Sequence, residues 1–394
     1  MKKNRADFAL YGGEKAFSAV KTVSNMVPPD RDVFFKYAKQ VFEKRQFTNN
    51  GYTVRELERQ LAVLHGVKHC ICVSSGFTAL MLALKALGLQ GKTEVVTPSP
   101  ANRFSGDIIE WAGFIPHFCD IEEETRTVSA QTVEKCINER TAALVIPHPV
   151  VTLCDIDEME ALAQKYDLPL IFNSIEADGA SYKGKMLGGF GNAEIFSMYA
   201  GECINAAEGG YITTNNDNLA DLLGKMRGFG FMTTDTVDCL GFNTKLNELH
   251  SAMGLAALSW IDKQISENKA MHLAYQEQFK NIAGLEIIPY AEDEKRNWKT
   301  CLVKINPEWP FSRDLTLEIL NAENINAQEY YNPPLHLTYS KDRAVFNSLP
   351  HTEKVCQEYM LFPFGYSMRI DDIKIIADVF KAMLQLKNEI LAPK

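Results

Sequence analysis

Residues 67–89 read VKHCICVSSGFTALMLALKALGL, and this stretch decides the fold. The apolar run at 70–74 predicts a buried strand, because it is short and bounded by turn residues. The turn Ser75-Gly76 follows it, and residues 78–87 have the apolar spacing of a helix. A strand that passes through a glycine turn into a helix is typical of the β-α-β units that build parallel sheets.

The same alternation surrounds this unit. Further helices are predicted at 54–64, 156–165 and 219–226. Further strands are predicted at 94–97, 115–119, 142–147, 169–172, 194–197 and 210–214. Strands and helices that alternate in this way predict an α/β domain, whose mostly parallel central sheet is covered by helices on both faces.

The pattern changes after residue 260. A long polar helix is predicted at 261–279, followed by short strands at 285–288 and 301–305 and by helices near 315–322 and 371–387. A chain of 394 residues is also long for one compact core. We therefore expect a large domain over residues 1–260, including an N-terminal arm, and a small C-terminal α+β domain over residues 261–394.

Composition and charge limit the partners. The net charge is −9 with acidic and basic residues interspersed, which argues against nucleic acid or an anionic membrane as the main partner. No apolar run approaches the ~20 residues of a membrane span, and residues 1–17 lack the apolar core of a signal peptide. The nine cysteines lack metal-ligand spacing, so we expect reduced thiols, no metal site and a cytoplasmic protein.

In an open parallel sheet, ligands bind beyond the carboxyl ends of the strands. The loops expected there are 75–78, 98–104, 147–155, 173–179 and 197–210. These loops and their flanking segments resemble, in the same order, the DegT/DnrJ/EryC1/StrS family of nucleotide-sugar aminotransferases, which use pyridoxal phosphate (PLP). The similar segments are Tyr11-Gly12-Gly13, FTNNGYTVRELERQLA (47–62), residues 67–89, FCDIEEETRTV (118–128), LPLIFNSIEADGASYKGKMLGGFGNAEIFSM (168–198), EGGYITTN (208–215), GFNTKLNELHSAMGLAAL (241–258) and YYNPPLH (330–336).

The resemblance implies the fold-type I aminotransferase architecture, with a large and a small domain. It also implies a homodimer whose two active sites lie at the interface. The substrates of the family are nucleotide-linked keto-sugars of surface-polysaccharide or secondary-metabolite pathways. The partner expected for this chain is therefore a nucleotide-linked sugar.

The position of the PLP-binding lysine is the most informative difference from the family. Where the family reads Ser-Phe-His-x-Thr-Lys, this chain has SMYAGE at 197–202, so Glu202 stands in place of the lysine. A carboxylate cannot form the Schiff base that holds PLP covalently. The nearest lysines in the sequence, Lys183 and Lys185, belong to a turn that active relatives share, and we expect them to carry surface charge.

Two further positions that contact the cofactor ring also differ. The family's aspartate, which pairs with the pyridine nitrogen, corresponds to Asn173, and an amide cannot balance a pyridinium charge. Loss of one partner of such a buried pair costs roughly 3–5 kcal/mol. The aromatic residue that stacks on the ring corresponds to Asn102, so about 0.5–1.5 kcal/mol of stacking is lost as well.

The phosphate site is only partly kept. The family's Ser-Gly-Thr turn at a helix N-terminus is here Ser75-Gly76-Phe77, which keeps the backbone donors and places a bulky ring at the turn. Ser197 is a retained phosphate ligand by resemblance, and Asn243 matches the residue that reaches the phosphate from the partner subunit. The His-x-Trp/Tyr-Gly turn retains only His148, since its aromatic residue and glycine are missing.

These differences predict a protein that has lost the PLP site and needs no cofactor. Two carboxylates in one desolvated cavity raise one pKa, which suits general acid/base catalysis. The hypothesis is proton-transfer chemistry on a nucleotide-linked sugar: epimerisation, isomerisation, elimination or hydrolysis. The candidate catalytic residues are Glu202, Glu176 and His148, and the candidate substrate-binding residues are Lys245, Tyr331 and His336.

Two alternatives remain open. In one, the chain is an inactive regulatory or binding subunit that pairs with an active aminotransferase. In the other, it binds PLP or pyridoxamine phosphate (PMP) non-covalently, with Glu202 as the base, as the family's sugar dehydratases do with a histidine at the lysine position.

Overall fold

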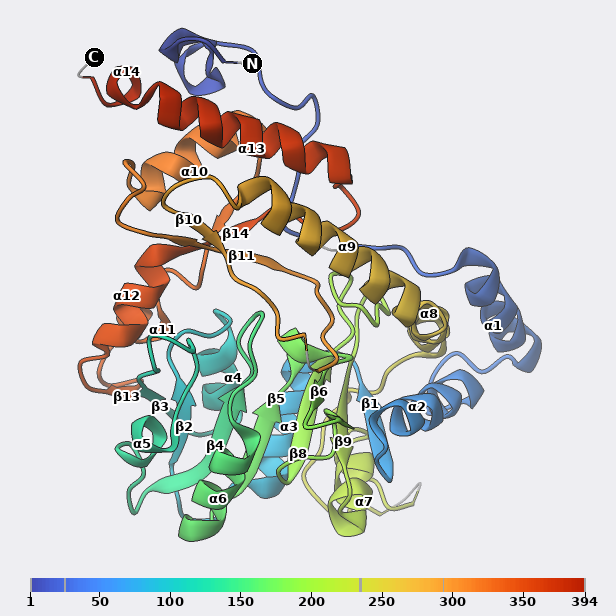
Figure 1. Ribbon diagram of the computed structural model, residues 1–394. Coiled ribbons are helices and arrows are strands. Elements are labelled where there is room, and N and C mark those ends of the chain that lie inside the picture. The colour runs from blue at the N-terminus through green and yellow to red at the C-terminus, as the bar shows by residue number, and fades with distance from the viewer. Residues whose placement is uncertain (1, 25, 234–235, 293, 393–394) are drawn as a thin grey trace.

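The computed structural model describes residues 2–24, 26–233, 236–292 and 294–392. Its main feature is an eight-stranded sheet in the order β1-β9-β8-β5-β4-β2-β3-β13 (Figure 1). The strands are β1 (His69–Val73), β2 (Glu94–Pro98), β3 (Ile115–Cys119), β4 (Thr141–Pro147), β5 (Leu170–Asn173), β8 (Ala193–Ser197), β9 (Gly210–Thr214) and β13 (Val345–Phe346). Only β9 is antiparallel to its neighbours, so the predicted mostly parallel sheet is confirmed.

Helices cover both faces of this sheet. The helices of this lobe are α1 (Arg31–Lys44), α2 (Tyr52–His65), α3 (Gly76–Leu87), α4 (Ser105–Trp111), α5 (Ala130–Glu134), α6 (Ile156–Tyr166), α7 (Asp217–Met226) and α8 (Glu248–Leu258), of which α1 packs on α8 and α2 at the side. Strand β1 alternates between two cores: Cys70 and Cys72 pack in the core that contains α2 and α6, whereas Ile71 and Val73 pack in the core of α3, α4 and α7. Period-two alternation between two apolar faces is what a strand covered by helices on both faces requires.

The rest of the chain forms a smaller lobe around an antiparallel sheet in the order β10-β11-β14-β12. Its strands are β10 (Leu285–Ile287), β11 (Cys301–Ile305), β12 (Gln328–Glu329) and β14 (Tyr359–Phe362), and its helices are α9 (Ile261–Phe279), α10 (Arg313–Ala322), α11 (Leu335–Thr338), α12 (Pro350–Glu358), α13 (Ile370–Gln385) and α14 (Lys387–Leu391). Figure 1 shows α9 running from this lobe toward α8 of the large lobe, and both chain ends beside α13 and α14.

The division at residue 260 remains a prediction. Two segments of the chain pack in the lobe on the other side of this boundary. The short strand β13 leaves the small lobe and pairs with β3 at the edge of the large sheet. In the other direction, the N-terminal turns η1 (Arg5–Asp7) and η2 (Ala9–Tyr11) lead into the small lobe, where Phe8 and Phe17 belong to the apolar core. Each lobe is therefore completed by a segment from the other end of the chain.

Two short elements lie between the lobes: the turn η3 (Ile175–Ala177) after β5, and the hairpin of β6 (Ser181–Tyr182) and β7 (Lys185–Met186). In the described parts of the chain, no helix is long and apolar enough to cross a membrane. Within the same residues, no group of three or more histidine, cysteine or carboxylate side chains is arranged to hold a metal ion.

Candidate functional site

The candidate site lies where β5 and β8 end side by side. These two strands are paired in parallel, so the chain segments that follow them leave the sheet at the same edge. Asn173 is the last residue of β5 and leads into η3, and Ser197 is the last residue of β8 and leads toward Glu202. The sequence prediction that the loops 173–179 and 197–210 meet at one place is therefore confirmed.

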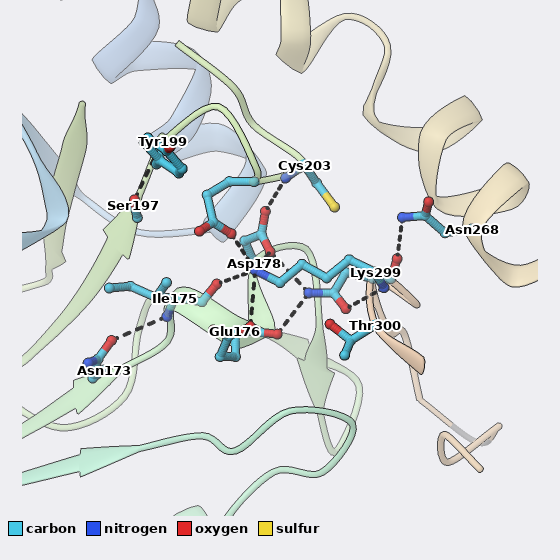
Figure 2. Close-up of polar contacts among 12 residues, drawn as sticks. Asn173, Ile175, Glu176, Asp178, Ser197, Tyr199, Cys203, Asn268, Lys299 and Thr300 are labelled. Carbon is cyan, nitrogen blue, oxygen red and sulfur yellow. Dashed lines mark hydrogen bonds and ion pairs between the residues drawn. The ribbon is translucent and has the colours of Figure 1, made fainter. Parts of the chain in front are cut away.

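A lysine from the small lobe enters this site. The Nζ atom of Lys299 donates to a carboxylate oxygen of Glu202 and, over 2.9 Å, to the carbonyl oxygen of Ile175. It also lies 3.4 Å from a carboxylate oxygen of Glu176 and 3.5 Å from one of Asp178. Figure 2 shows the Lys299 side chain reaching across to Glu176, Asp178 and the Ile175 carbonyl.

The four charged side chains of this cluster are buried to different degrees. Lys299 is 6% exposed and Asp178 is 1% exposed, whereas Glu202 is 12% and Glu176 27% exposed. Asp178 also accepts the backbone N–H of Cys203 over 3.1 Å, which ties η3 to the loop that carries Glu202. Glu176 is therefore the carboxylate of the cluster most open to an incoming molecule.

One cation faces three carboxylates, and this imbalance sets the ionisation of the site. Burial raises the pKa of Glu202 to about 8; the charge of Lys299 opposes this shift, whereas Asp178 and Glu176 add to it. The pKa of Lys299 lies well above its usual value, because the surrounding carboxylates outweigh the effect of burial. Lys299 is therefore a permanent cation, and Glu202 is a carboxyl group that exchanges its proton near neutral pH.

The raised pKa of Glu202 predicts how stability depends on pH. The folded protein keeps this proton up to about pH 8, whereas an unfolded chain loses it near the ordinary value of 4.5. The folded state then binds more protons across this window, so the free energy of unfolding falls as pH rises through it. We expect Glu202→Gln to remove roughly 1 kcal/mol per pH unit of this slope between pH 7 and 8, measured by urea unfolding.

The pH range of this experiment avoids the buried histidines. Burial lowers the pKa of His65 to about 4, of His148 to about 3 and of His272 to about 4, so their contributions are lost only as pH falls below about 6.5. Burial raises the pKa of Glu194 to about 7, and this group contributes equally to the pH dependence of stability in wild type and in Glu202→Gln. Equal slopes in wild type and Glu202→Gln would contradict the assigned proton.

The retained phosphate turn is shaped by the chain's own side chains. Ser75 caps α3 by accepting from the backbone of Thr78 over 3.1 Å, and the Ser197 hydroxyl oxygen accepts the Tyr199 N–H over 3.1 Å. A Cβ placed on Gly76 would lie 3.1 Å from Cβ of Ser197 and 3.3 Å from Cδ1 of Ile175. The Ile175 side chain thus lies directly against the turn expected to receive a phosphate.

The bulky ring that the sequence places at the phosphate turn is that of Phe77. Its ring packs against the core of α3, α4 and α7, because the first turn of α3 directs it away from the sheet edge. Ile175 is the side chain that lies next to the turn instead. Asn102, the expected ring-stacking position, is exposed and accepts the backbone N–H of Phe104 over 3.1 Å.

His148 is held away from the charged cluster. It is 1% exposed, its ring is stacked on Phe172 with centroids 5.5 Å apart, and its Nδ1 accepts the Cys154 N–H over 3.4 Å. Among the residues that the structure describes, no hydrogen bond or ion pair joins His148 to Glu202 or Glu176. With a pKa of about 3 it stays neutral, so the geometry gives this predicted catalytic residue a packing position.

The predicted substrate-binding residues are spread around the site. Tyr331 lies closest: its ring is 4.5 Å from that of Tyr330, and the charge of Glu176 adds to the effect of burial in raising its pKa. Lys245 has its Nζ 4.7 Å from the centroid of Phe229, beside the exposed Asn243.

His336 is buried, and both of its ring nitrogens are engaged. Its Nδ1 lies 2.8 Å from the Ser99 hydroxyl oxygen, and its Nε2 lies 3.3 Å from a Glu353 carboxylate oxygen. These contacts give His336 a structural position between the loop after β2 and the small lobe.

The structure therefore brings together Glu202 and Glu176, as predicted. It adds Lys299 and Asp178, which the sequence analysis missed. Lys299 is 97 residues away from Glu202 in the chain and belongs to no motif that points to the site. The two lysines nearest in sequence do carry surface charge: Lys183 pairs with Asp157, and Lys185 donates to a backbone carbonyl. One feature of the sequence could have indicated Lys299. Two carboxylates predicted in one buried site, with no cation nearby in the sequence, require a cation from another part of the chain.

The two-lobed fold and a polar site at the carboxyl ends of parallel strands define a fold-type I, aminotransferase-like α/β protein. The chain belongs to the DegT/DnrJ/EryC1/StrS aminotransferase family, whose model matches residues 29–381. It is 29% identical to the dTDP-4-amino-4,6-dideoxy-D-glucose transaminase of Escherichia coli over 309 residues, which cover 77% of this chain and 82% of that protein. Family membership supports a sugar-modifying role.

Solved structures agree with this assignment. DesI, determined in the presence of its TDP-sugar product, superposes with a TM-score of 0.90 at 29% identity and covers 98% of this chain and 97% of its own. The GDP-4-keto-6-deoxymannose-3-dehydratase ColD with bound GDP-perosamine gives a TM-score of 0.82 at 20% identity, covering 91% of this chain and 100% of its own. The second likeness concerns the fold alone.

Proposed function

We propose that this protein binds a nucleotide-linked sugar and transfers protons on it without PLP. The pathway would be surface-polysaccharide or secondary-metabolite biosynthesis, and the protein would act as a cytoplasmic homodimer with its sites at the interface. The observation that carries the proposal is the buried ion pair of Glu202 and Lys299, at the position where the family binds its cofactor.

Four features argue against a PLP site in this chain. Glu202 cannot form a Schiff base, and Asn173 cannot balance a pyridinium charge. Ile175 crowds the phosphate turn, since its Cδ1 lies 3.3 Å from the position of a Cβ on Gly76. Lys299 is a second amine in the site, but three carboxylates keep it protonated, and a protonated amine has no lone pair with which to attack an aldehyde.

The chemistry that fits the site is proton exchange next to a keto group. The Glu202 carboxylate takes the proton from the carbon beside the carbonyl. The electron pair of that C–H bond forms a C=C bond, and the π electron pair of the carbonyl moves to its oxygen. Return of a proton to the carbon restores the ketone, either unchanged or inverted at that carbon. A pKa near 8 supplies both forms of Glu202 at working pH, which is the condition for efficient acid/base catalysis.

The other residues take supporting roles in this proposal. Glu176, the most open carboxylate of the cluster, and Tyr331 beside it face the sugar. Lys245 and Asn243 bind the nucleotide part. His148 and His336 shape the surrounding loops.

The alternative of a non-enzymatic binding or regulatory subunit is favoured by one observation: Lys299 is engaged by Glu202, Glu176, Asp178 and the Ile175 carbonyl at once. Such a cluster stabilises a closed site without any chemistry. The dehydratase-like alternative, with Glu202 as base and PLP or PMP bound non-covalently, predicts a visible spectral change when PLP is added.

The test uses two nucleotide-linked 4-keto-6-deoxyhexoses, one linked to GDP and one to dTDP, in deuterated water, followed by proton NMR of the sugar. We expect the wild-type protein to exchange the proton beside the keto group, and Glu202→Gln to slow this exchange by about 10²–10⁴-fold. Glu176→Gln should slow the exchange and also weaken binding of the sugar. Lys304→Met, which removes a partly exposed ion pair with Glu358, should change neither the exchange rate nor the binding. Binding without exchange would favour the regulatory subunit, and exchange that is unaffected by Glu202→Gln would refute the assigned base.

A further inference from the structure

A short segment of the small lobe is fastened across the site. Residues 294–299, here called the interlobe strap, lead from the small lobe to Lys299. The Ser181 N–H donates to the Lys295 carbonyl oxygen over 3.0 Å, and the Lys295 N–H donates to the Ser181 hydroxyl oxygen over 2.9 Å. Arg296 donates to the Ser181 carbonyl oxygen over 2.7 Å. The strap is therefore held to β6 of the large lobe along its first half.

The second half of the strap is held to η3. The Asn297 amide donates to the Glu176 carbonyl oxygen over 2.9 Å and to an Asp178 carboxylate oxygen over 3.0 Å. Asn268 of α9 donates in turn to the Asn297 carbonyl oxygen over 3.1 Å, and the backbone N–H of Lys299 donates to the Asn297 side chain over 3.3 Å. Figure 2 shows the Asn268 side chain directed at the backbone of the strap, close to Lys299.

The backbone of the strap is strained one residue before Lys299. Trp298 has a φ of 54°, in the left-handed region that a bulky residue rarely adopts. Its ring is 5% exposed, 4.7 Å from the Tyr290 ring and 5.3 Å from the His272 ring. A residue stays in such a conformation only where its surroundings over-determine it, and such strain is found preferentially at functional sites. The packing of Trp298 directs the next side chain into the site.

Lys299 lies at the end of this arrangement, opposite Glu202. The titratable groups that face Glu202 are Lys299 from the strap, Glu176 and Asp178 from η3 and its end, and the neighbouring Cys203. Lys299 is the cation among them, and every hydrogen bond of the strap described above serves to place it.

We propose that Lys299 is the positioning residue of the site: the strained interlobe strap delivers its ammonium group from the small lobe, where it orients the Glu202 carboxyl and keeps that buried group able to ionise. Its consequence for proton transfer to a sugar rests on the proposed function. The placement of Lys299 against Glu202 does not rest on the proposed function, because it concerns only groups of this chain. The small lobe thereby controls the acid/base group of the large lobe.

The experiment follows the ionisation of Glu202 directly, without any ligand. The intact protein is labelled with ¹³C at the glutamate carboxyl carbon, the Glu202 signal is identified by its loss in Glu202→Gln, and its titration midpoint is measured by NMR. We expect Lys299→Met to raise this midpoint by about 1–3 pH units, because a cation within hydrogen-bond distance is lost. Lys299→Arg keeps the charge and should stay close to wild type.

A midpoint that is unchanged in Lys299→Met would overturn the proposal. If that variant does not fold, Lys299→Met/Asp178→Asn is compared with Asp178→Asn alone, since the pair again differs only in Lys299. Lys304→Met is the matched control and should leave the midpoint unchanged. A shifted midpoint together with no exchange on either the GDP-linked or the dTDP-linked keto-sugar would retain the positioning role and remove the proposed function. Exchange with an unshifted midpoint would retain the proposed function and remove the positioning role.

Discussion

Lys299→Met is expected to lower the free energy of unfolding by about 3–5 kcal/mol at pH 7. Lys299 is the cation that faces the carboxylates of Glu202, Glu176 and Asp178, two of which are almost completely buried. Removal of one partner from a buried ion pair leaves the other charge desolvated and uncompensated, which costs far more than the pair itself contributes. The measurement is urea unfolding followed by circular dichroism.

Two comparisons separate this effect from a simple loss of a lysine. Lys304→Met removes a partly exposed pair with Glu358 from the adjoining strand β11 and should cost at most about 1 kcal/mol. Lys299→Arg keeps the charge and should lose less stability than Lys299→Met. Equal losses in Lys299→Met and Lys304→Met, or in Lys299→Met and Lys299→Arg, would show that the cluster does not act as a buried ion-pair network.

The second large effect concerns PLP. We expect purified wild-type protein to show no saturable absorption change with PLP and no adduct after borohydride reduction. Glu202→Lys alone should not restore covalent binding, although it returns the missing amine. Asn173 still leaves the pyridine nitrogen without a carboxylate, and Ile175 still crowds the phosphate turn 3.3 Å from the Cβ position of Gly76.

The combined variant Glu202→Lys/Asn173→Asp/Ile175→Ala should bind PLP about two to four orders of magnitude more tightly than Glu202→Lys. This range converts the 3–5 kcal/mol of a restored buried charge pair at 1.36 kcal/mol per factor of ten. Lys299 should assist, because a neighbouring cation lowers the pKa of a new lysine at 202 and favours its reactive neutral form. Covalent capture by Glu202→Lys alone, or a wild-type adduct that maps to Lys299, would contradict this account.

Some elements have the bounds predicted from the sequence. They are the strands 115–119, 210–214 and 301–305 and the helix 261–279. Each of these strands is followed directly by a turn residue: Asp120, Asn215 or Asn306. The strands β13 and β14 were not predicted. A two-residue strand such as Val345–Phe346 has no period to detect, and it is a strand only because β3 offers an open edge beside it.

The candidate site was predictable to the extent that it depends on colinear motifs. Glu202 and Glu176 were found because they occupy named positions next to strands whose ends meet at one edge of the sheet. Asp178 and Lys299 were missed. Asp178 lies within a predicted loop but matches no motif, and the fastening of the strap to Ser181 and η3 depends on contacts between the two lobes.

The sequence by itself determined the family, the order of strands and helices, and the loss of the cofactor lysine, because these depend on local patterns and on residues counted along one chain. Only the tertiary structure decided what replaces that lysine. The partner of Glu202 comes from the other lobe, 97 residues away, and an ion pair of this kind is specified by three-dimensional packing and by the cost of burying an uncompensated charge. No spacing rule along the chain encodes that cost, so the cation of the site becomes visible only when the lobes are placed together.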